Sequence, residues 1–260
     1  MKFAVSGKGG VGKTLVAGVL ATFFAEKGFK VLAIDADPSP NLALTLGISP
    51  DEAKKIVPIS ENTQLIESKT KTDYSGVYRL SFSVDDIVKD FSVKTPYNVN
   101  LLVMGTVRSA GTGCLCPANA VVRALLQHLY VERSEVVVMD MEAGVEHLGR
   151  GTAKHVDAML LITDSSFKAM ETAKKIYELT TEMGIKKLFL IGNKIANANE
   201  GKLIEKFAEN NNILLLGLIP YDKQIVEADI HGESPIKHVS KSKGIAVIRQ
   251  SGESLIKQIT

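Results

Sequence analysis

Short apolar runs alternate with longer stretches of mixed character along almost the whole chain. The runs are nearly continuous in apolar residues, which is typical of strands that helices cover on both faces. They predict seven strands: Lys2–Ser6, Lys30–Ile34, Asn100–Met104, Glu135–Met139, Ala158–Thr163, Lys187–Ile191 and Leu214–Leu218. Strands that alternate with helices indicate an α/β fold with a mostly parallel sheet flanked by helices on both faces.

In the intervening stretches, apolar residues recur at the three- and four-residue spacing of helices. The predicted helices are Thr14–Lys27, Cys116–Tyr130, Lys168–Met183, Lys202–Asn210 and Lys243–Ile259. Gly28 and Gly184 follow two of them, at the position where a left-handed residue commonly ends a helix. The last helix is amphipathic, and we expect it to dock on the sheet rather than to lie on a membrane surface.

Residues 47–98 interrupt the alternation of strands and helices. They are polar, contain Pro50, Pro58 and Pro96, and include short mixed stretches such as VYRLSFSV. We therefore expect a single domain over residues 1–260, with 47–98 as an insertion that carries short secondary structure such as a small hairpin. The sequence leaves the role of this insertion open.

The composition is that of a globular protein, since 45% of the 260 residues are hydrophobic and 23% are charged. A net charge of +2 is too small to favour nucleic acid or an acidic membrane as a partner. The N-terminal residues reach glycines before a signal-peptide core develops, and no apolar run approaches the ~18 residues of a membrane span. The two cysteines form no disulfide framework, so we expect a cytoplasmic protein.

A glycine-rich motif lies between the first predicted strand and the first predicted helix. It matches the P-loop pattern G-x-x-x-x-G-K-[ST] with Gly7, Lys8, Gly9, Gly10, Val11, Gly12, Lys13 and Thr14. Glycines let consecutive N–H groups point at phosphate oxygens, and the helix N-terminus adds a favourable partial positive charge. In such a loop Lys13 neutralises the β- and γ-phosphates and the Thr14 hydroxyl ligates Mg²⁺. The motif predicts a P-loop NTPase.

A carboxylate ends another predicted strand. Val136-Val137-Val138-Met139-Asp140 is an apolar run closed by an acid, which is the Walker B pattern. Ligands of open α/β sheets bind at the carboxyl ends of the strands. We therefore expect Asp140 to hold Mg²⁺, directly or through water.

Lys8 follows the first glycine of the motif, and the GKGGVGKT loop resembles the deviant Walker A of the MinD/ParA/nitrogenase-iron-protein group of ATPases. The resemblance implies a homodimer in which Lys8 reaches the partner's nucleotide; a solvated surface lysine is the alternative. It implies that Asp37 orients or activates the attacking water and that Asp35 helps to hold the Mg²⁺ water shell. A plain Asp-Pro turn is the alternative there. Gly144 would meet the γ-phosphate as part of switch II.

The identity of the base is indicated by Asn193-Lys194, at the end of a predicted strand. In GTPases an aspartate two residues beyond that lysine accepts hydrogen bonds from guanine, and here Ala196 takes its place. ATP is therefore favoured, with Asn193 contacting the polar edge of adenine. Pro220, Tyr221 and Asp222 resemble the second adenine-facing loop of the same group. Both loops are also compatible with ordinary turns.

Cys114 and Cys116 form a C-x-C pair in a glycine-rich loop. One pair supplies two thiolates, whereas a closed zinc site needs four ligands. A two-fold dimer would supply four thiolates, a set that suits Zn²⁺ and accepts Ni²⁺. Buried, inert cysteines are the alternative.

Taken together, the P-loop with Lys8, the segments Asp35–Pro38 and Asp140–Thr152 and the C-x-C loop resemble the CooC family. Members of that family are ATPases that assist nickel insertion into carbon monoxide dehydrogenase. The resemblance covers essentially the whole chain, and it implies a homodimeric metallochaperone with one metal held by both C-x-C pairs. His147 is left out of the predicted metal ligands, because a surface position in switch II is the simpler interpretation.

Two other functions remain as alternatives. A MinD/ParA-type positioning or partitioning ATPase would need a membrane surface on Lys243–Ile259, or a DNA surface at Lys237, Lys241 and Lys243. These lysines stand among acidic neighbours, as on a solvated face. An iron–sulfur scaffold would need a second cysteine after Asp140, which this chain lacks. The physiological metal, the client enzyme and the trigger of dimerisation are not determined by the sequence.

Overall fold

The computed structural model describes residues 1–74, 79, 84–105, 120–122, 124–125, 135–141 and 156–259. Within this part, an eight-stranded sheet has the order β3-β4-β2-β5-β1-β6-β7-β8. The strands are β1 (Lys2–Gly7), β2 (Lys30–Ala36), β3 (Val93–Lys94), β4 (Val99–Val103), β5 (Glu135–Met141), β6 (Ala158–Thr163), β7 (Leu188–Ile195) and β8 (Leu214–Pro220). Neighbouring strands are parallel except for β3 and β4.

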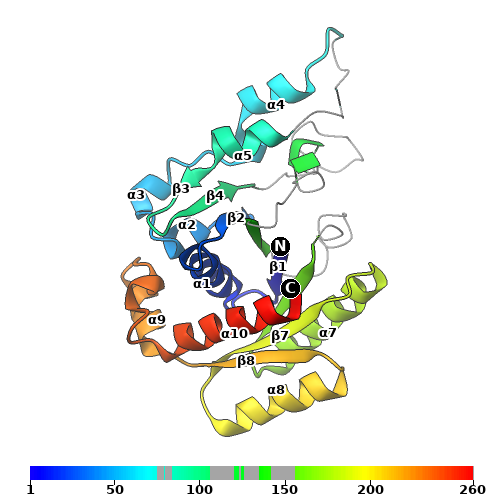
Figure 1. Ribbon diagram of the computed structural model, residues 1–260, viewed down its shortest axis with the longest axis vertical. Coiled ribbons are helices and arrows are strands. Elements are labelled where there is room, and N and C mark those ends of the chain that lie inside the picture. Colours follow the sequence, from blue (N-terminus) through cyan, green and yellow to red (C-terminus); the bar gives the residue numbers. More distant parts are fainter. Residues whose placement is uncertain are drawn as a thin grey trace.

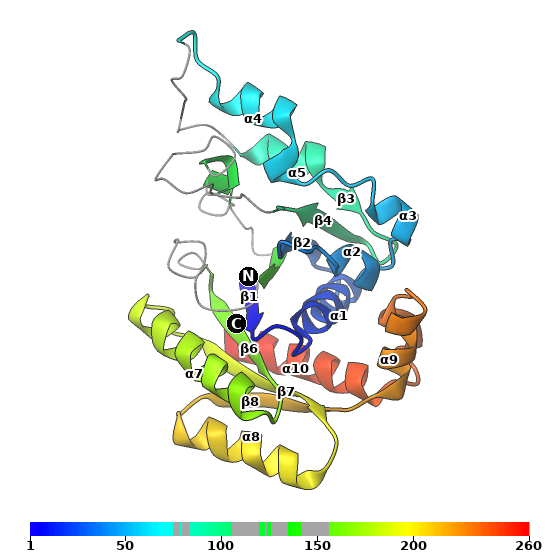
Figure 2. The ribbon, with the colours of Figure 1, turned by 180° about the vertical axis from the view of Figure 1, so that it is seen from behind.

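Helices cover both faces of the sheet. They are α1 (Lys13–Glu26), α2 (Leu42–Thr45), α3 (Pro50–Ala53), α4 (Thr63–Thr70), α5 (Asp85–Phe91), α7 (Phe167–Glu182), α8 (Ala198–Asn210), α9 (Lys223–Ile230) and α10 (Lys243–Ile259), with 3₁₀ turns at Ile59–Glu61 and Pro235–His238. Helices α1 and α10 lie on one face (Figure 1), and α7 and α8 cover the other (Figure 2). The structure confirms the α/β fold that the sequence predicts.

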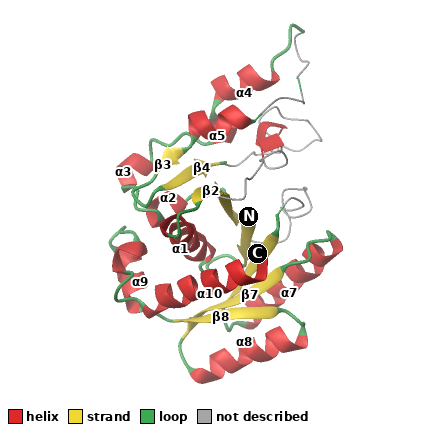
Figure 3. Cartoon of the chain, in the orientation of Figure 1, coloured by secondary structure: helices red, strands yellow, loops and turns green. Residues whose placement is uncertain are grey.

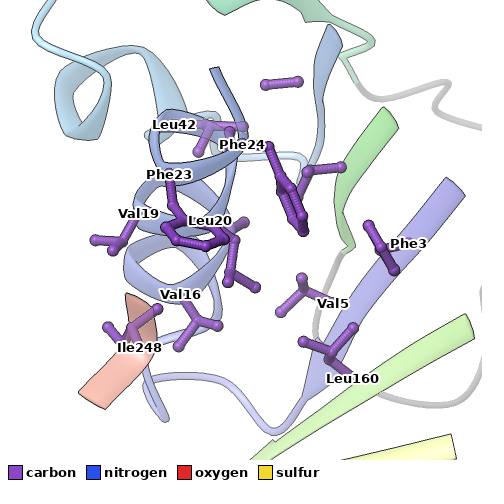
Figure 4. Packing of buried hydrophobic residues seen from close by; sticks show 14 of the residues in the cluster. Phe3, Val5, Val16, Val19, Leu20, Phe23, Phe24, Leu42, Leu160 and Ile248 are labelled. Carbon is purple, nitrogen blue, oxygen red and sulfur yellow. The ribbon is translucent and has the colours of Figure 1, made fainter. Parts of the chain in front are cut away.

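The core consists of two buried apolar clusters, and β1 contributes side chains to both. Phe3 and Val5 belong to the cluster beneath α1 and α10, and Ala4 belongs to the cluster on the opposite face. Successive side chains of a strand point to opposite faces, so a continuous apolar run serves both layers. Figure 4 shows Phe3 and Val5 facing α1, where the ring of Phe24 stacks on Phe3 at 5.4 Å between centroids.

All seven predicted strands are present, and five of them, including β2, β5 and β7, extend beyond their predicted C-terminal ends. β2 continues through Asp35, β5 through Asp140, and β7 through Asn193 and Lys194. The apolar run ends before the strand does, because backbone pairing continues into polar residues, most of which are themselves buried. Asp35, Asp140, Asn193 and Lys194 therefore lie in the last residues of strands rather than in loops.

The predicted helices are also present, with one start displaced and one helix largely outside the description. α8 begins at Ala198, earlier than predicted, because Asn197 caps it by accepting a hydrogen bond from the Glu200 N–H at 3.1 Å. Of the predicted helix Cys116–Tyr130, residues 120–122 and 124–125 are helical and the others lie outside the described residues. Gly28 and Gly184 have φ of +89° and +83°, which confirms the two left-handed helix ends.

Residues 47–98 hold short elements, as expected, but most of them are helices. Figure 3 shows the helices α3, α4 and α5 in this region, which the sequence did not predict. The hairpin is formed by β3 and β4, since Val93 and Lys94 pair with the start of the following strand. Most of VYRLSFSV lies outside the described residues.

The last helix docks on the fold as predicted. Ile245, Ile248 and Leu255 of α10 are fully buried against β8 and α1, and Figure 4 shows Ile248 facing α1. Arg249 pairs with Glu26 of α1 at 2.5 Å. Among the helices that the structure describes, none combines the length and the apolarity needed to cross a bilayer.

Candidate functional site

The carboxyl ends of β1, β2 and β5 meet at one edge of the sheet. In the register of these strands, Asp35 of β2 lies opposite Asp140 of β5. On its other side Asp140 lies opposite Val5, just before Gly7 and the P-loop motif. Because parallel strands end at the same edge, the motif and two acidic residues from distant parts of the chain come together.

The backbone of the P-loop motif requires glycine at its two ends. Gly12, directly before α1, has φ of +97°, and a Cβ there would collide with the side-chain amide of Asn193. At Gly7 a Cβ would collide with the carbonyl oxygen of Ile162 on β6. The motif is therefore held close to both neighbouring strands, and only residues without a side chain fit.

Two lysines of the motif differ in their surroundings. Lys13, the first residue of α1, is buried, and its Nζ donates to the Lys8 carbonyl at 3.4 Å. The Lys8 side chain is half-buried, and within the described residues its ammonium forms no hydrogen bond or ion pair. One cation is thus enclosed beside the loop backbone, while the other has no partner among the described residues.

Asp140 is a buried carboxylate at the end of β5. It is 1% exposed, and neither oxygen has a hydrogen bond to any residue that the structure describes. Burial raises the pKa of Asp140 to about 7, although the neighbouring Thr14 hydroxyl and the Lys13 ammonium oppose this rise. A buried anion needs a counter-charge. Oxygen atoms of a carboxylate and a hydroxyl are a donor set that fits Mg²⁺.

The Asp35 carboxylate has backbone partners. Its Oδ2 accepts a hydrogen bond from the Leu42 N–H at 2.9 Å, and its Oδ1 accepts one from the Asp37 N–H at 3.2 Å. These bonds tie the end of β2 to the start of α2. Burial nevertheless raises the pKa of Asp35 to about 6. Its place in a Mg²⁺ water shell stays a prediction.

Asp37 stands in a turn, which is the alternative that its Asp-Pro sequence left open. The carboxylate oxygen Oδ1 accepts a hydrogen bond from the Ser39 N–H at 2.9 Å, and the residue is half-buried. The second oxygen has no hydrogen bond within the described residues. Both the turn and a role in orienting water are compatible with this arrangement, so the catalytic role stays a prediction.

Asn193 and Lys194, at the end of β7, are bound to the P-loop motif. Asn193 Nδ2 donates to the Val11 carbonyl and Lys194 Nζ donates to the Gly10 carbonyl, both at 2.7 Å. The predicted contact between Asn193 and adenine is not tested by this geometry. At the position of the guanine-selecting aspartate, the Ala196 N–H donates to Glu200 at 2.9 Å.

A cavity of about 470 Å³ adjoins the motif. Gly12 and Thr14 line it at one end, and Pro220, Tyr221 and Asp222 line it from the β8 side. The Asp222 carboxylate is already bonded, because its Oδ2 accepts from Ser242 Oγ at 2.7 Å and from the Gly244 N–H at 3.0 Å. The cavity falls within the size range of small-molecule pockets.

The apolar walls of this cavity were missed by the sequence analysis. They come from α2 and α9, two short helices that were not predicted, and include Leu44, Thr45, Ile225 and Val226. A signal for α9 was present, since Asp222 is a good N-cap residue and accepts from the Gln224 N–H. Four further residues singled out by the sequence, Cys114, Cys116, Gly144 and His147, lie outside the described residues.

Comparison with known proteins agrees with this site. The model of the CobQ/CobB/MinD/ParA nucleotide binding domain family matches residues 2–236. The carbon monoxide dehydrogenase accessory protein CooC of Rhodospirillum rubrum is 42% identical over 236 residues, which is 90% of this chain and 89% of that protein. An uncharacterized ATP-binding protein of Methanocaldococcus jannaschii is 40% identical over 245 residues, which is 93% of each chain.

A solved structure supports the fold. The cell division ATPase MinD of Pyrococcus furiosus superposes with a TM-score of 0.71, covering 99% of this chain and 98% of that one. At 23% identity, this similarity concerns the fold alone.

Proposed function

The chain belongs to the CobQ/CobB/MinD/ParA nucleotide-binding family and is an ATPase, and we propose that it is a metallochaperone that assists nickel insertion into carbon monoxide dehydrogenase. The observation that carries the proposal is the 42% identity to CooC, which extends over about nine-tenths of both chains. The C-x-C pair of Cys114 and Cys116 supports it, because a metallochaperone needs a site for its cargo.

In this proposal the P-loop motif receives the phosphates of ATP. Glycine N–H groups and the N-terminus of α1 face the phosphate oxygens, and buried Lys13 neutralises the β- and γ-phosphates. Adenosine occupies the cavity beside the motif, with Asn193 and the loop Pro220–Asp222 along its wall. Leu44 of α2 and Ile225 of α9, both half-buried, give the base a non-polar surface.

Thr14 and Asp140 are the residues that would hold Mg²⁺, with Asp35 in the water shell. The unpartnered carboxylate of Asp140 supports this assignment, because a divalent cation would supply the counter-charge that its burial demands. When bound, Mg²⁺ neutralises charge on the phosphate oxygens.

In the proposed hydrolysis, Asp37, Lys8 and Gly144 each have a role. Asp37 orients the water that attacks the γ-phosphorus as the bond to the bridging oxygen of ADP breaks. Lys8 of a second subunit places its charge on the transferred phosphoryl group, so that hydrolysis requires a homodimer. Gly144 contacts the γ-phosphate and loses that contact when phosphate leaves.

The cargo is a metal ion between the two subunits. Cys114 and Cys116 from each protomer would supply four thiolates to Ni²⁺ or Zn²⁺. Departure of phosphate from Gly144 would loosen the dimer and release the metal to the client enzyme. This coupling requires two states that differ in metal affinity.

Anaerobic native mass spectrometry with Ni²⁺ tests the proposal. The wild type is compared with Cys114→Ala/Cys116→Ala, with and without ATP, and Lys13→Ala serves as a control that keeps both cysteines. We expect one metal for each wild-type dimer and none in the double variant. A wild type that binds no metal, or a double variant that binds it equally well, would reject the metallochaperone.

A positioning or partitioning ATPase is the competing function. Its membrane-binding form would need the apolar face of α10, and that face is buried against β8 and α1. Sedimentation with anionic liposomes and with DNA separates the two functions. Clear ATP-dependent retention on either would favour the positioning ATPase.

A further inference from the structure

Two adjacent side chains at the end of β7 donate hydrogen bonds to backbone carbonyls of the P-loop motif. Asn193 is 4% exposed, and its amide donates to the Val11 carbonyl at 2.7 Å; Lys194 Nζ donates to the Gly10 carbonyl at 2.7 Å. Asn193 and Lys194 are more than 180 positions away from the motif in the chain. These are contacts that only the folded sheet creates.

The backbone of β7 is shaped to bring both side chains to the same loop. Neighbouring residues of a regular strand point to opposite faces, so they do not ordinarily reach one target. Here the pairing of β7 with β8 shifts register between Gly192 and Ile195, and Lys194 has φ of +60°. A left-handed conformation is costly for a lysine. The Asn193 Oδ1 helps to hold it by accepting the Lys194 N–H at 2.8 Å.

The two hydrogen bonds fix the orientation of two peptide planes. In a trans peptide the N–H points away from the C=O of the same plane. Holding the carbonyls of Gly10 and Val11 toward β7 therefore turns the N–H groups of Val11 and Gly12 away from it. The contact is close enough that Gly12 has no room for a Cβ beside the Asn193 amide. A glycine-rich loop would otherwise lose much backbone entropy when a ligand orders it.

We propose that Asn193 and Lys194 are positioning residues that hold the P-loop in its phosphate-binding shape before the nucleotide arrives. This inference rests on the proposed nucleotide site and deepens it. Ordering the loop during folding removes that cost from binding, so the pair raises affinity for the polyphosphate part of the ligand. The effect is independent of any contact between Asn193 and the base.

The test compares a ligand that has a base with one that has none. Dissociation constants of Mg-ATP and Mg-tripolyphosphate are measured by calorimetry for the wild type, Asn193→Ala and Lys194→Met. Asn193→Ala changes no charge, and Lys194→Met alters an exposed side chain, so one variant remains usable if the other fails to fold. Asn197→Ala, which removes a helix cap in the same loop without touching the motif, is the control.

We expect both variants to bind Mg-tripolyphosphate and Mg-ATP about tenfold more weakly, by the same factor for each ligand. The control variant should lose thermal stability and keep both affinities. An Asn193→Ala protein that loses affinity for Mg-ATP alone would make this residue a base contact and overturn the inference. Unchanged affinities in both variants would also overturn it. A wild type that binds neither ligand would reject the phosphate site itself, and the inference with it.

Discussion

At the scale of single residues, the site combines buried carboxylates with glycines that no other residue could replace. Asp140 and Asp35 face each other across β5 and β2, both enclosed by the sheet. Burial raises the pKa of each above its ordinary value of 3.8, to about 7 and about 6 respectively. Burial therefore makes the ionised form of each carboxylate costly in the nucleotide-free protein.

Replacing Asp140 should change the pH dependence of stability. A carboxyl whose folded pKa is raised binds more protons in the folded state than in the unfolded state, so stability falls as pH rises from about 4 through about 7. Asp140→Asn removes this charge at nearly constant volume. We expect the nucleotide-free variant to be more stable than the wild type at about pH 8 by roughly 1–3 kcal/mol, with a small difference near pH 4.

Urea unfolding across this pH range, without Mg²⁺, measures the effect. Asp86→Asn is a suitable control, because that carboxylate is largely exposed and its pKa is lowered by Lys69. Equal pH profiles for the wild type and Asp140→Asn would contradict the prediction. Activity of Asp140→Asn should be lost in spite of the gain in stability.

Substitutions at two glycines of the P-loop motif should show how much stability is lost through backbone strain and how much through a steric clash. Gly10 and Gly12 have φ of +80° and +97°, but a Cβ at Gly10 meets no atom within 4 Å, whereas one at Gly12 collides with Asn193. Gly10→Ala should destabilise by about 1–2 kcal/mol through strain alone. Gly12→Ala should cost clearly more in denaturant unfolding and should abolish nucleotide binding. Equal costs would show that Asn193 moves aside freely.

At the scale of elements, α1 and α10 pack against each other on one face of the sheet beside the site. α10 buries Ile245, Ile248 and Leu255, and the guanidinium of Arg249 lies 5.6 Å from the ring centre of Phe23 on α1. These contacts hold the C-terminal half of α1, and the same continuous helix begins at Lys13 in the P-loop motif. The stability of the element and the geometry of the site are therefore linked.

Truncating the interface should loosen this layer. Ile248→Ala removes a fully buried side chain and should lower the free energy of unfolding by about 2–4 kcal/mol. Leu203→Ala on α8, where the leucine is 51% exposed, should cost less than about 1 kcal/mol. Urea unfolding of both variants measures the difference. Similar losses at the two positions would contradict the burial of α10.

At the scale of the whole molecule, distant segments of the chain bring the described site residues together at one place. The carboxyl ends of the central strands gather the motif, the acidic residues and the cavity at one edge of the sheet. Lys8 lies there with no described partner for its ammonium. A second subunit facing this edge would give that charge a target, as the proposed dimer requires.

Lys8→Ala should separate nucleotide binding from dimerisation. We expect the variant to bind Mg-ATP in its own subunit, to remain monomeric with a non-hydrolysable analogue, and to hydrolyse ATP at least about 100-fold more slowly. Sedimentation velocity and steady-state kinetics measure these properties, with Lys206→Ala, which removes an exposed lysine on α8, as the control. A Lys8→Ala protein that dimerises and hydrolyses ATP normally would reject the role of Lys8 across the interface.

Several features of this protein followed from its sequence alone. Apolar runs predicted the strands and the parallel α/β sheet, because burial on both faces is a local property of each run. The glycine motif and Asp140 were found because a strand, a tight loop and a helix start leave their signals in a few adjacent residues. Membership of an ATPase family follows from the same short motifs.

Tertiary structure decided what each of these residues touches. The sequence placed Asn193 and Asp222 in two adenine-facing loops, which stays a prediction; only the fold shows that Asn193 bonds to the P-loop motif and Asp222 to the start of α10. The apolar walls of the cavity come from short helices whose residues carry no strong local pattern. These features depend on contacts between distant segments, and such contacts form only when the sheet has set the order and register of its strands.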